Sequence, residues 1–198
     1  MKTNSISFTS RINFIPERVF DNIINKGSFI DWAQPETMIK KADSDIWTYG
    51  IRTCTAGGII NSKTKEVVGF HIYDNEDNFL NIDTLLKRLF KLMPNADGAL
   101  IIGGKDIYNR RYSTPIFNKI KEALLQNIPN VTIFEKHKIP NSESNICYSA
   151  LKDEWYLNTI YSRGFSAKLE NVKNKKELCD NFEKIQISKN DILNIEPS

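Results

Sequence analysis

The pattern of apolar and polar positions in the middle of the chain alternates between strand-like and helix-like segments. A small, apolar run at residues 54–60 and a strand-like run at residues 67–73 flank a polar turn at residues 61–65. Two such runs separated by a short polar turn are typical of an antiparallel strand pair. We therefore predict a β-hairpin that has Cys54 at the start of one arm and His71 within the other.

Apolar residues spaced three or four apart predict two helices, at residues 82–93 and 115–126. Pro94 ends the first helix, and Pro115 suits the first turn of the second. Short β-prone runs predict further strands at residues 47–52, 99–102, 131–134, 145–150 and 155–157. This order of elements predicts an α/β fold, an α/β sandwich in which helices pack on a mixed β-sheet.

The two ends of the chain differ from this central part in composition. We expect one domain over residues 45–160, an N-terminal extension over residues 1–44 with a short helix around residues 19–24, and a polar C-terminal extension over residues 161–198.

Composition and charge narrow the class of protein. The net charge of +3 is small and spread along the 198 residues, which argues against a nucleic-acid partner. No run approaches the roughly 18 apolar residues that span a bilayer, so no membrane segment is expected. The start of the chain lacks the apolar core of a Sec signal peptide, and the bias towards Lys, Asn and Ile is typical of AT-rich bacterial genomes. We expect the protein in the bacterial cytoplasm, or delivered to a host cytosol by a specialised secretion system.

Three cysteines and two histidines are the residues best suited to nucleophilic chemistry. The odd cysteine count without C-x-x-C spacing predicts reduced thiols, with Cys147 in a core strand and Cys179 in a helix. His137 lies in a charged stretch, whereas His71 lies in an apolar strand. Taken singly, Cys54 is typical of a small buried residue and His71 of a strand histidine. Together on one hairpin they match a thiolate–imidazole pair, in which the base activates the thiol.

The spacing of this pair resembles the CheD family of protein glutamine deamidases. Thr48 stands six residues before Cys54, and His71 stands seventeen residues after it, as in the CheD signature. The run at residues 99–104 is similar to the family's apolar strand that ends in Phe-Gly-Gly. The resemblance covers residues from about 45 to 160. Arg52-Thr53 replaces the family's Gly-Ser, and Val67-Val68 replaces its Gly-Gly.

The resemblance implies a bacterial hydrolase that converts a glutamine of a target protein to glutamate. Cys54 is then the thiol nucleophile, His71 the base, and Thr48 the residue that orients the imidazole. The backbone N–H groups of Thr53 and Cys54 are expected to stabilise the oxyanion. No cofactor and no metal are expected, and the partner is the protein substrate of a monomeric enzyme. Deamidase toxins such as the cytotoxic necrotizing factors and the Burkholderia lethal factor also resemble CheD, and the two extensions favour such an effector or toxin acting on a host protein.

Two other functions remain open on the sequence alone. The chain is another thiol hydrolase, such as a peptidase or amidase, if the product is a cut chain rather than a glutamate. It is a non-catalytic binding module on the same fold if Cys54 is unreactive.

Two further motifs are incomplete. Gly103-Gly104-Lys105 lacks the remainder of a phosphate-binding loop, and the acidic residues at 74–77 lack the Gly and the final Glu of a calcium loop. We therefore expect a polar turn at residues 74–78. The tryptophans are expected to serve in packing, and for Trp47 the alternative is that it lines the substrate cleft beside Thr48: Trp32, Trp47 and Trp155.

Overall fold

The strands of the protein form two β-sheets in the computed structural model, which describes residues 11–15, 20, 27–104, 111–135, 142–161 and 192–195. One sheet has five strands in the order β1 (Arg11–Phe14), β10 (Glu154–Tyr161), β9 (Ser142–Ser149), β4 (Ile46–Ile51), β2 (Ser28–Phe29). The other has six strands in the order β11 (Ile192–Ile195), β8 (Asn130–Glu135), β7 (Gly98–Gly103), β5 (Thr55–Asn61), β6 (Glu66–Ile72), β3 (Ile39–Ala42). Each sheet contains parallel and antiparallel pairs.

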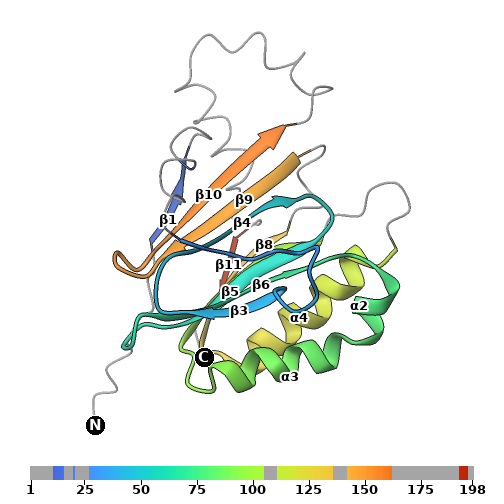
Figure 1. The fold of residues 1–198 in the computed structure, drawn as a ribbon, viewed down its shortest axis with the longest axis horizontal. Coiled ribbons are helices and arrows are strands. Elements are labelled where there is room, and N and C mark those ends of the chain that lie inside the picture. The colour runs from blue at the N-terminus through green and yellow to red at the C-terminus, as the bar shows by residue number, and fades with distance from the viewer. Residues whose placement is uncertain are drawn as a thin grey trace, which may run out of the picture.

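The sheets and helices form three layers, with the six-stranded sheet in the middle (Figure 1). The five-stranded sheet covers one face, and the helices cover the other: α2 (Glu76–Leu80), α3 (Ile82–Leu92) and α4 (Ser113–Asn127). The predicted α/β class, a mixed sheet with helices packed on it, is confirmed. The division of the strands between two sheets goes beyond what the sequence pattern resolved.

The central sheet is apolar on both faces because it separates two cores. Along β6, Val68, Phe70 and Ile72 pack against the helices, whereas Val67 packs against the five-stranded sheet. Successive strand residues point to opposite faces, so a strand covered on both sides reads as a nearly continuous apolar run. His71 is the polar residue in this run, and it shares the face of Val67.

The predicted hairpin and the two longer helices are confirmed. Strands β5 and β6 pair antiparallel, with Thr55 opposite Ile72 and Ala56 opposite His71. Helices α3 and α4 begin and end within two residues of the predicted bounds. The burial of Ile116 and Ile120 on α4 follows the predicted apolar spacing.

The predicted polar turn at residues 74–78 is wrong in its second half, where α2 begins at Glu76. The side chain of Asn75 caps the helix by accepting a hydrogen bond of 2.8 Å from the N–H of Asn78. Two acidic residues in the first turn, Glu76 and Asp77, suit the positive end of the helix dipole. These are helix-start signals, and they outweigh the turn-like composition.

Both predicted extensions contribute strands to the sheets. Strand β1 pairs with β10, β2 pairs with β4, and β11 pairs with β8. Of the predicted helix at residues 19–24, only the buried Phe20 lies among the described residues. His137, Cys179 and Lys105 lie outside them.

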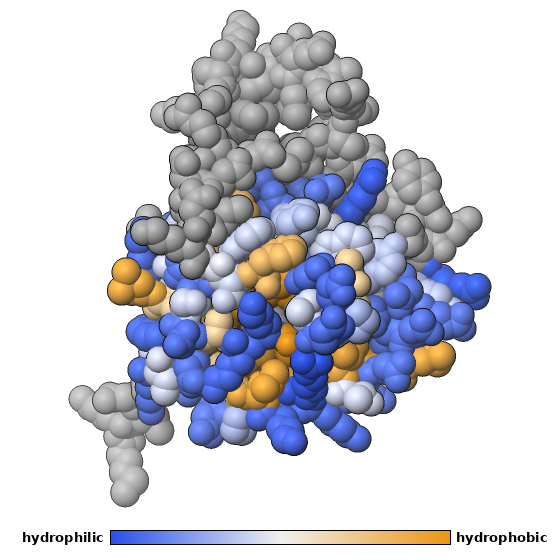
Figure 2. All heavy atoms as spheres, in the orientation of Figure 1, coloured by the Kyte–Doolittle hydropathy of each residue, from blue (hydrophilic) through white to orange (hydrophobic). Residues whose placement is uncertain are grey.

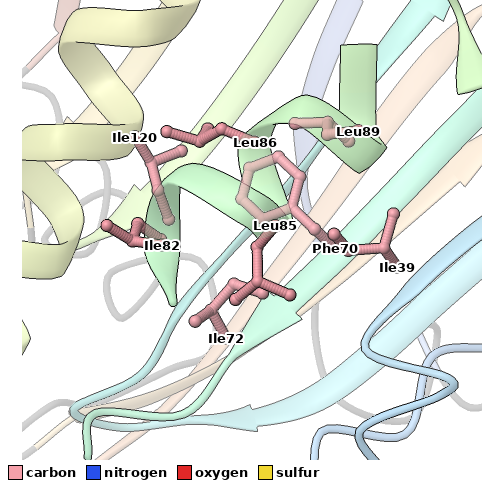
Figure 3. Close-up of a pocket in the computed structure, with 8 residues that line it drawn as sticks. All are labelled: Ile39, Phe70, Ile72, Ile82, Leu85, Leu86, Leu89 and Ile120. Carbon is pink, nitrogen blue, oxygen red and sulfur yellow. The ribbon is translucent and has the colours of Figure 1, made fainter. Parts of the chain in front are cut away.

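A small cavity lies between α3, α4 and the central sheet (Figure 3). Its volume is about 10 Å³, little more than the room for one water molecule. Every side chain around it is apolar: Ile39, Phe70, Ile72, Ile82, Leu85, Leu86, Leu89 and Ile120. It is a packing gap in the helix-side core and offers no polar group to a substrate.

The outer surface is mixed in character. Figure 2 shows one face, on which hydrophilic residues surround separate apolar patches. None of the helices in the described ranges combines the length and apolar character that a membrane crossing requires.

Replacing Gly57 by alanine is expected to destabilise the central sheet. A Cβ at this position would collide with the backbone carbonyl oxygen of Leu100 and approach Phe70 Cζ to 2.8 Å. We expect the free energy of unfolding in urea to fall by about 1–3 kcal/mol, the range for overpacked cores. Leu151→Ala is the control, because Leu151 is 90% exposed and its change should stay within about 0.5 kcal/mol. Equal stabilities of the two variants would contradict the packing argument.

Candidate functional site

His71 is held from the opposite sheet by Thr48. The Oγ1 atom of Thr48 lies 2.7 Å from His71 Nδ1 and 3.0 Å from the carbonyl oxygen of Ile30. A carbonyl oxygen accepts only, so the single hydroxyl proton goes to Ile30, and Nδ1–H donates to Thr48. This arrangement assigns the proton of the neutral imidazole to Nδ1 and leaves the lone pair on Nε2. His71 therefore has the tautomer that a base acting through Nε2 requires.

A β-bulge follows Thr48 on β4, at Gly50. Three residue steps from Thr48 to Ile51 on β4 match two steps from Ile146 to Ser144 on β9, so β4 carries one extra residue. Gly50 has φ +75°, which glycine adopts without strain. The bulge lets Thr48 and Ile51 both face the central sheet although they are three positions apart, a step that would reverse the side-chain direction in a regular strand. Thr48 is fully buried there.

Cys54 lies directly before β5, next to the end of β6. The pair Thr55–Ile72 is the first of the hairpin ladder at this end, and Ala56 is opposite His71. Cys54 is thus one residue outside the first pair, and His71 is one residue inside it. In a regular ladder such diagonal neighbours are about 7–8 Å apart. Cys54 is 4% exposed and His71 is 0% exposed, so both predicted residues are buried at this end of the hairpin.

Two buried side chains hold the residue before Cys54. The hydroxyl of Thr53 donates to Asp74 Oδ1 at 2.9 Å, and the hydroxyl of Ser113 donates to the carbonyl oxygen of Thr53 at 2.6 Å. Thr53, Asp74 and Ser113 are all buried. The second contact brings the first residue of α4 against the peptide that leads into Cys54.

The segment from Ile30 to Met38 is fastened to the same site at both ends. The carbonyl of Ile30 accepts from Thr48, and the carbonyl of Met38 accepts a hydrogen bond of 2.9 Å from the N–H of His71. Between these points, Trp32 places its ring 5.9 Å from the His71 ring and 5.1 Å from the Tyr73 ring. Trp32 and Tyr73 are therefore stacked, half-buried rings, and the Trp32 ring lies beside the imidazole.

Trp47 has the packing role expected from the sequence, and the alternative that it lines this site is wrong. It neighbours Thr48 along β4, and neighbouring strand residues point to opposite faces. Its ring packs against Phe29 and Tyr49, with ring centroids 4.6 and 6.1 Å away. Trp32 is the tryptophan next to His71. The sequence around Trp32 did not predict this contact.

Cys147 is a core thiol, as predicted. It is fully buried on the outer side of the five-stranded sheet, in a cluster with Phe20 and Tyr156. Burial, with a smaller contribution from the negative charge of Asp45, raises the pKa of Cys147 to about 12. Cys54 and Cys147 are both outside disulfide bonds.

A surface hollow and possible metal ligands were the other candidates in the described ranges. A surface hollow of about 450 Å³ lies between Asp43, Ser44, Asp45, Lys65, Ala150 and Leu151. It is at the turn end of the β5–β6 hairpin, about 20 Å along the strands from Cys54 at ~3.4 Å per residue. Within the part of the chain that the structure describes, no group of three or more His, Cys, Asp or Glu side chains could hold a metal ion.

No protein-family model matches the chain, and no curated protein matches its sequence. The described residues define an α/β fold with a buried hydrogen bond between Thr48 and His71, and Cys54 directly precedes the strand that pairs with that of His71.

Thr48→Val is expected to change the His71 tautomer. Valine has the shape of threonine without the hydroxyl, so the Ile30 carbonyl and His71 Nδ1–H both lose their partner. The free energy of unfolding should fall by about 1–3 kcal/mol. Nitrogen-15 NMR should show the proton on Nδ1 in the wild type and a mixture of tautomers in the variant, with His137→Gln used to assign the signals. Thr48→Ser should retain the wild-type pattern; a wild-type proton on Nε2 would contradict the assignment.

Cys147 is expected to resist alkylation in the folded protein. Iodoacetamide reacts with thiolates, and a thiol whose pKa is about 12 is almost fully protonated near pH 8.5, the ordinary pKa of a cysteine. Peptide mass analysis should find Cys147 modified only after unfolding in urea. Equal rates in the folded and unfolded protein would show that this side of the sheet opens readily.

Proposed function

We propose that the protein is a cysteine-dependent amidohydrolase that deamidates a glutamine of a partner protein, as the resemblance to CheD implies. The observation that carries this proposal is the hydrogen bond between Thr48 and His71. It unites two of the three residues of the predicted motif across different sheets, and it leaves His71 in the tautomer of a base. The third residue, Cys54, lies one position beyond the hairpin ladder that carries His71.

The chemistry proceeds in two steps through a thioester. Nε2 of His71 takes the proton of Cys54, and the sulfur attacks the carboxamide carbon of the glutamine to form a C–S bond and an oxyanion. The oxyanion collapses, the C–N bond breaks, and His71 returns the proton to the departing ammonia. Water then attacks the thioester carbon, giving up its proton to His71. The C–S bond breaks, and the products are glutamate and the Cys54 thiol.

Helix α4 begins against the peptide that leads into the thiol. Its first residue, Ser113, contacts the peptide that joins Thr53 to Cys54. Thr48 lacks the negative charge of the aspartate in serine-protease triads, so it orients the imidazole without stabilising the imidazolium. A modest rate is the expected consequence.

Trp32 and Tyr73 suit the apolar part of a glutamine side chain. The Trp32 ring lies beside His71 and stacks on the Tyr73 ring, and Trp32 is half-buried, so one part of it faces solvent. The two methylene groups of glutamine gain by packing on an aromatic surface while the carboxamide reaches the buried pair.

The enclosure of the pair favours a second function, the non-catalytic binding module. A thiol that is 4% exposed next to a fully buried imidazole also fits a core residue. The two functions differ in the reactivity of Cys54.

The deciding experiment measures the alkylation rate of Cys54 by iodoacetamide against pH, in the wild type and in His71→Ala. Peptide masses separate Cys54 from Cys147 and Cys179. We expect the wild-type Cys54 to react as a thiolate below neutral pH, and we expect His71→Ala to shift the profile towards the ordinary thiol pKa of about 8.5. Purified partner proteins would then be screened for a glutamine that gains about one dalton, the change from amide to acid in the thioester route.

Cys147 is the internal control, since its pKa of about 12 keeps it unreactive in every folded sample. The proposal fails if Cys54 titrates as an ordinary thiol in both proteins, or if it stays unmodified in both. Either result would make the binding module the leading function. A cut substrate chain with unchanged glutamines would instead identify a peptidase.

A further inference from the structure

We propose that Ser113 is a positioning residue, which orients the backbone N–H of Cys54 for the oxyanion. This inference rests on the proposed function and deepens it, because it assigns a role to a residue outside the Cys54, His71 and Thr48 set. Its basis is the 2.6 Å hydrogen bond from Ser113 Oγ to the carbonyl oxygen of Thr53.

That hydrogen bond fixes the orientation of a whole peptide group. The carbonyl of Thr53 and the N–H of Cys54 belong to the same peptide, which is planar and trans. In such a peptide the C=O and the N–H point in opposite directions. Ser113 holds the oxygen on the side of α4, so the N–H of Cys54 points away from α4. A rotation that turned this N–H would have to break the hydrogen bond from Ser113.

Asp74 restrains the same residue through its side chain. Its Oδ1 accepts from Thr53 Oγ1 at 2.9 Å, so Thr53 is held at its side chain by Asp74 and at its carbonyl by Ser113. The exposed fractions are 7% for Thr53, 3% for Asp74 and 0% for Ser113. Buried hydrogen bonds between elements far apart in sequence resist exchange with water, so the peptide before the nucleophile is pre-organised rather than ordered by the substrate.

The position of Ser113 on its helix also argues for a role outside the helix. Serine commonly caps a helix N-terminus with its own hydroxyl. Here the N-cap is Tyr112, which makes no side-chain capping bond, and Ser113 is the first helical residue. Its hydroxyl proton is committed to Thr53, on the segment that leads into β5.

Two small reagents distinguish an effect on the orientation of the Cys54 N–H from an effect on the reactivity of the Cys54 sulfur. Alkylation by iodoacetamide displaces iodide at a saturated carbon and forms no oxyanion. Acetylation by p-nitrophenyl acetate passes through one: the sulfur attacks the ester carbonyl, p-nitrophenolate leaves, and an acetyl thioester forms. Removing one oxyanion donor typically slows such reactions by about 100- to 1,000-fold. A donor that is loosened rather than removed should cost at least about tenfold.

The experiment compares both rates at Cys54 in the full-length wild type, Ser113→Ala, Ser113→Thr and Thr114→Ala, with Cys54→Ala as the background. Thr114→Ala is the matched control, because Thr114 also donates to a backbone carbonyl at the start of α4, that of Gly104 at 3.3 Å. We expect Ser113→Ala to lose at least about tenfold in acetylation while its alkylation rate and pH profile stay within about twofold. We expect Ser113→Thr to restore acetylation, and Thr114→Ala to retain both rates.

Three results would overturn the inference. Equal losses in both reactions would mean that Ser113 supports the fold around the thiol in general. Unchanged acetylation in Ser113→Ala would mean that the peptide keeps its orientation without Ser113. The third result concerns the wild type. If its Cys54 has the His71-dependent thiolate but is acetylated no faster than an ordinary thiol of the same pKa, the oxyanion donor itself is absent. A wild type without that thiolate marks the separate failure of the proposed function, and the inference falls with it.

Discussion

A histidine buried completely between two β-sheets has to find hydrogen-bond partners inside the protein, because water does not reach it. Thr48 on the five-stranded sheet supplies the partner of His71 on the central sheet, and the Ile30 carbonyl takes the remaining proton of the threonine. This one contact links the two sheets and selects the tautomer. The bulge at Gly50 then lets Ile51 face the same side of β4 as Thr48.

The segment before β5 depends on the same principle of buried polar groups satisfying each other. Thr53 is bonded to Asp74, which follows β6, and to Ser113, which begins α4. The residue before Cys54 is therefore held by two contacts. One is with Asp74, just after β6, and the other is with Ser113, the first residue of α4. Such convergence of elements gives Cys54 a defined position, and it excludes most of the solvent from the thiol.

Local patterns predicted those elements whose burial is periodic. Helix α4 buries Ile116, Ile120 and Leu124 on one side, and this spacing is visible in the sequence. Strand β6 was visible as an apolar run because it is buried on both faces. The short edge strands β1, β2 and β11 carry no such signal, since an edge strand is defined by the strand it pairs with. The start of α2 was misjudged because Asn75 and the acidic residues after it suit both a turn and a helix cap.

For the candidate site, the sequence by itself predicted the hairpin that carries Cys54 and His71, because two apolar runs flank a short polar turn. The place of Thr48 rested on its spacing within a family motif. Only the tertiary structure decided that Thr48 faces His71 from another sheet, that Trp32 rather than Trp47 stands beside the imidazole, and that Asp74 and Ser113 hold Thr53. These contacts join single residues on elements that are separated along the chain. A hydrogen bond or ring contact of that kind has no period, and it arises only when the sheets and α4 pack together.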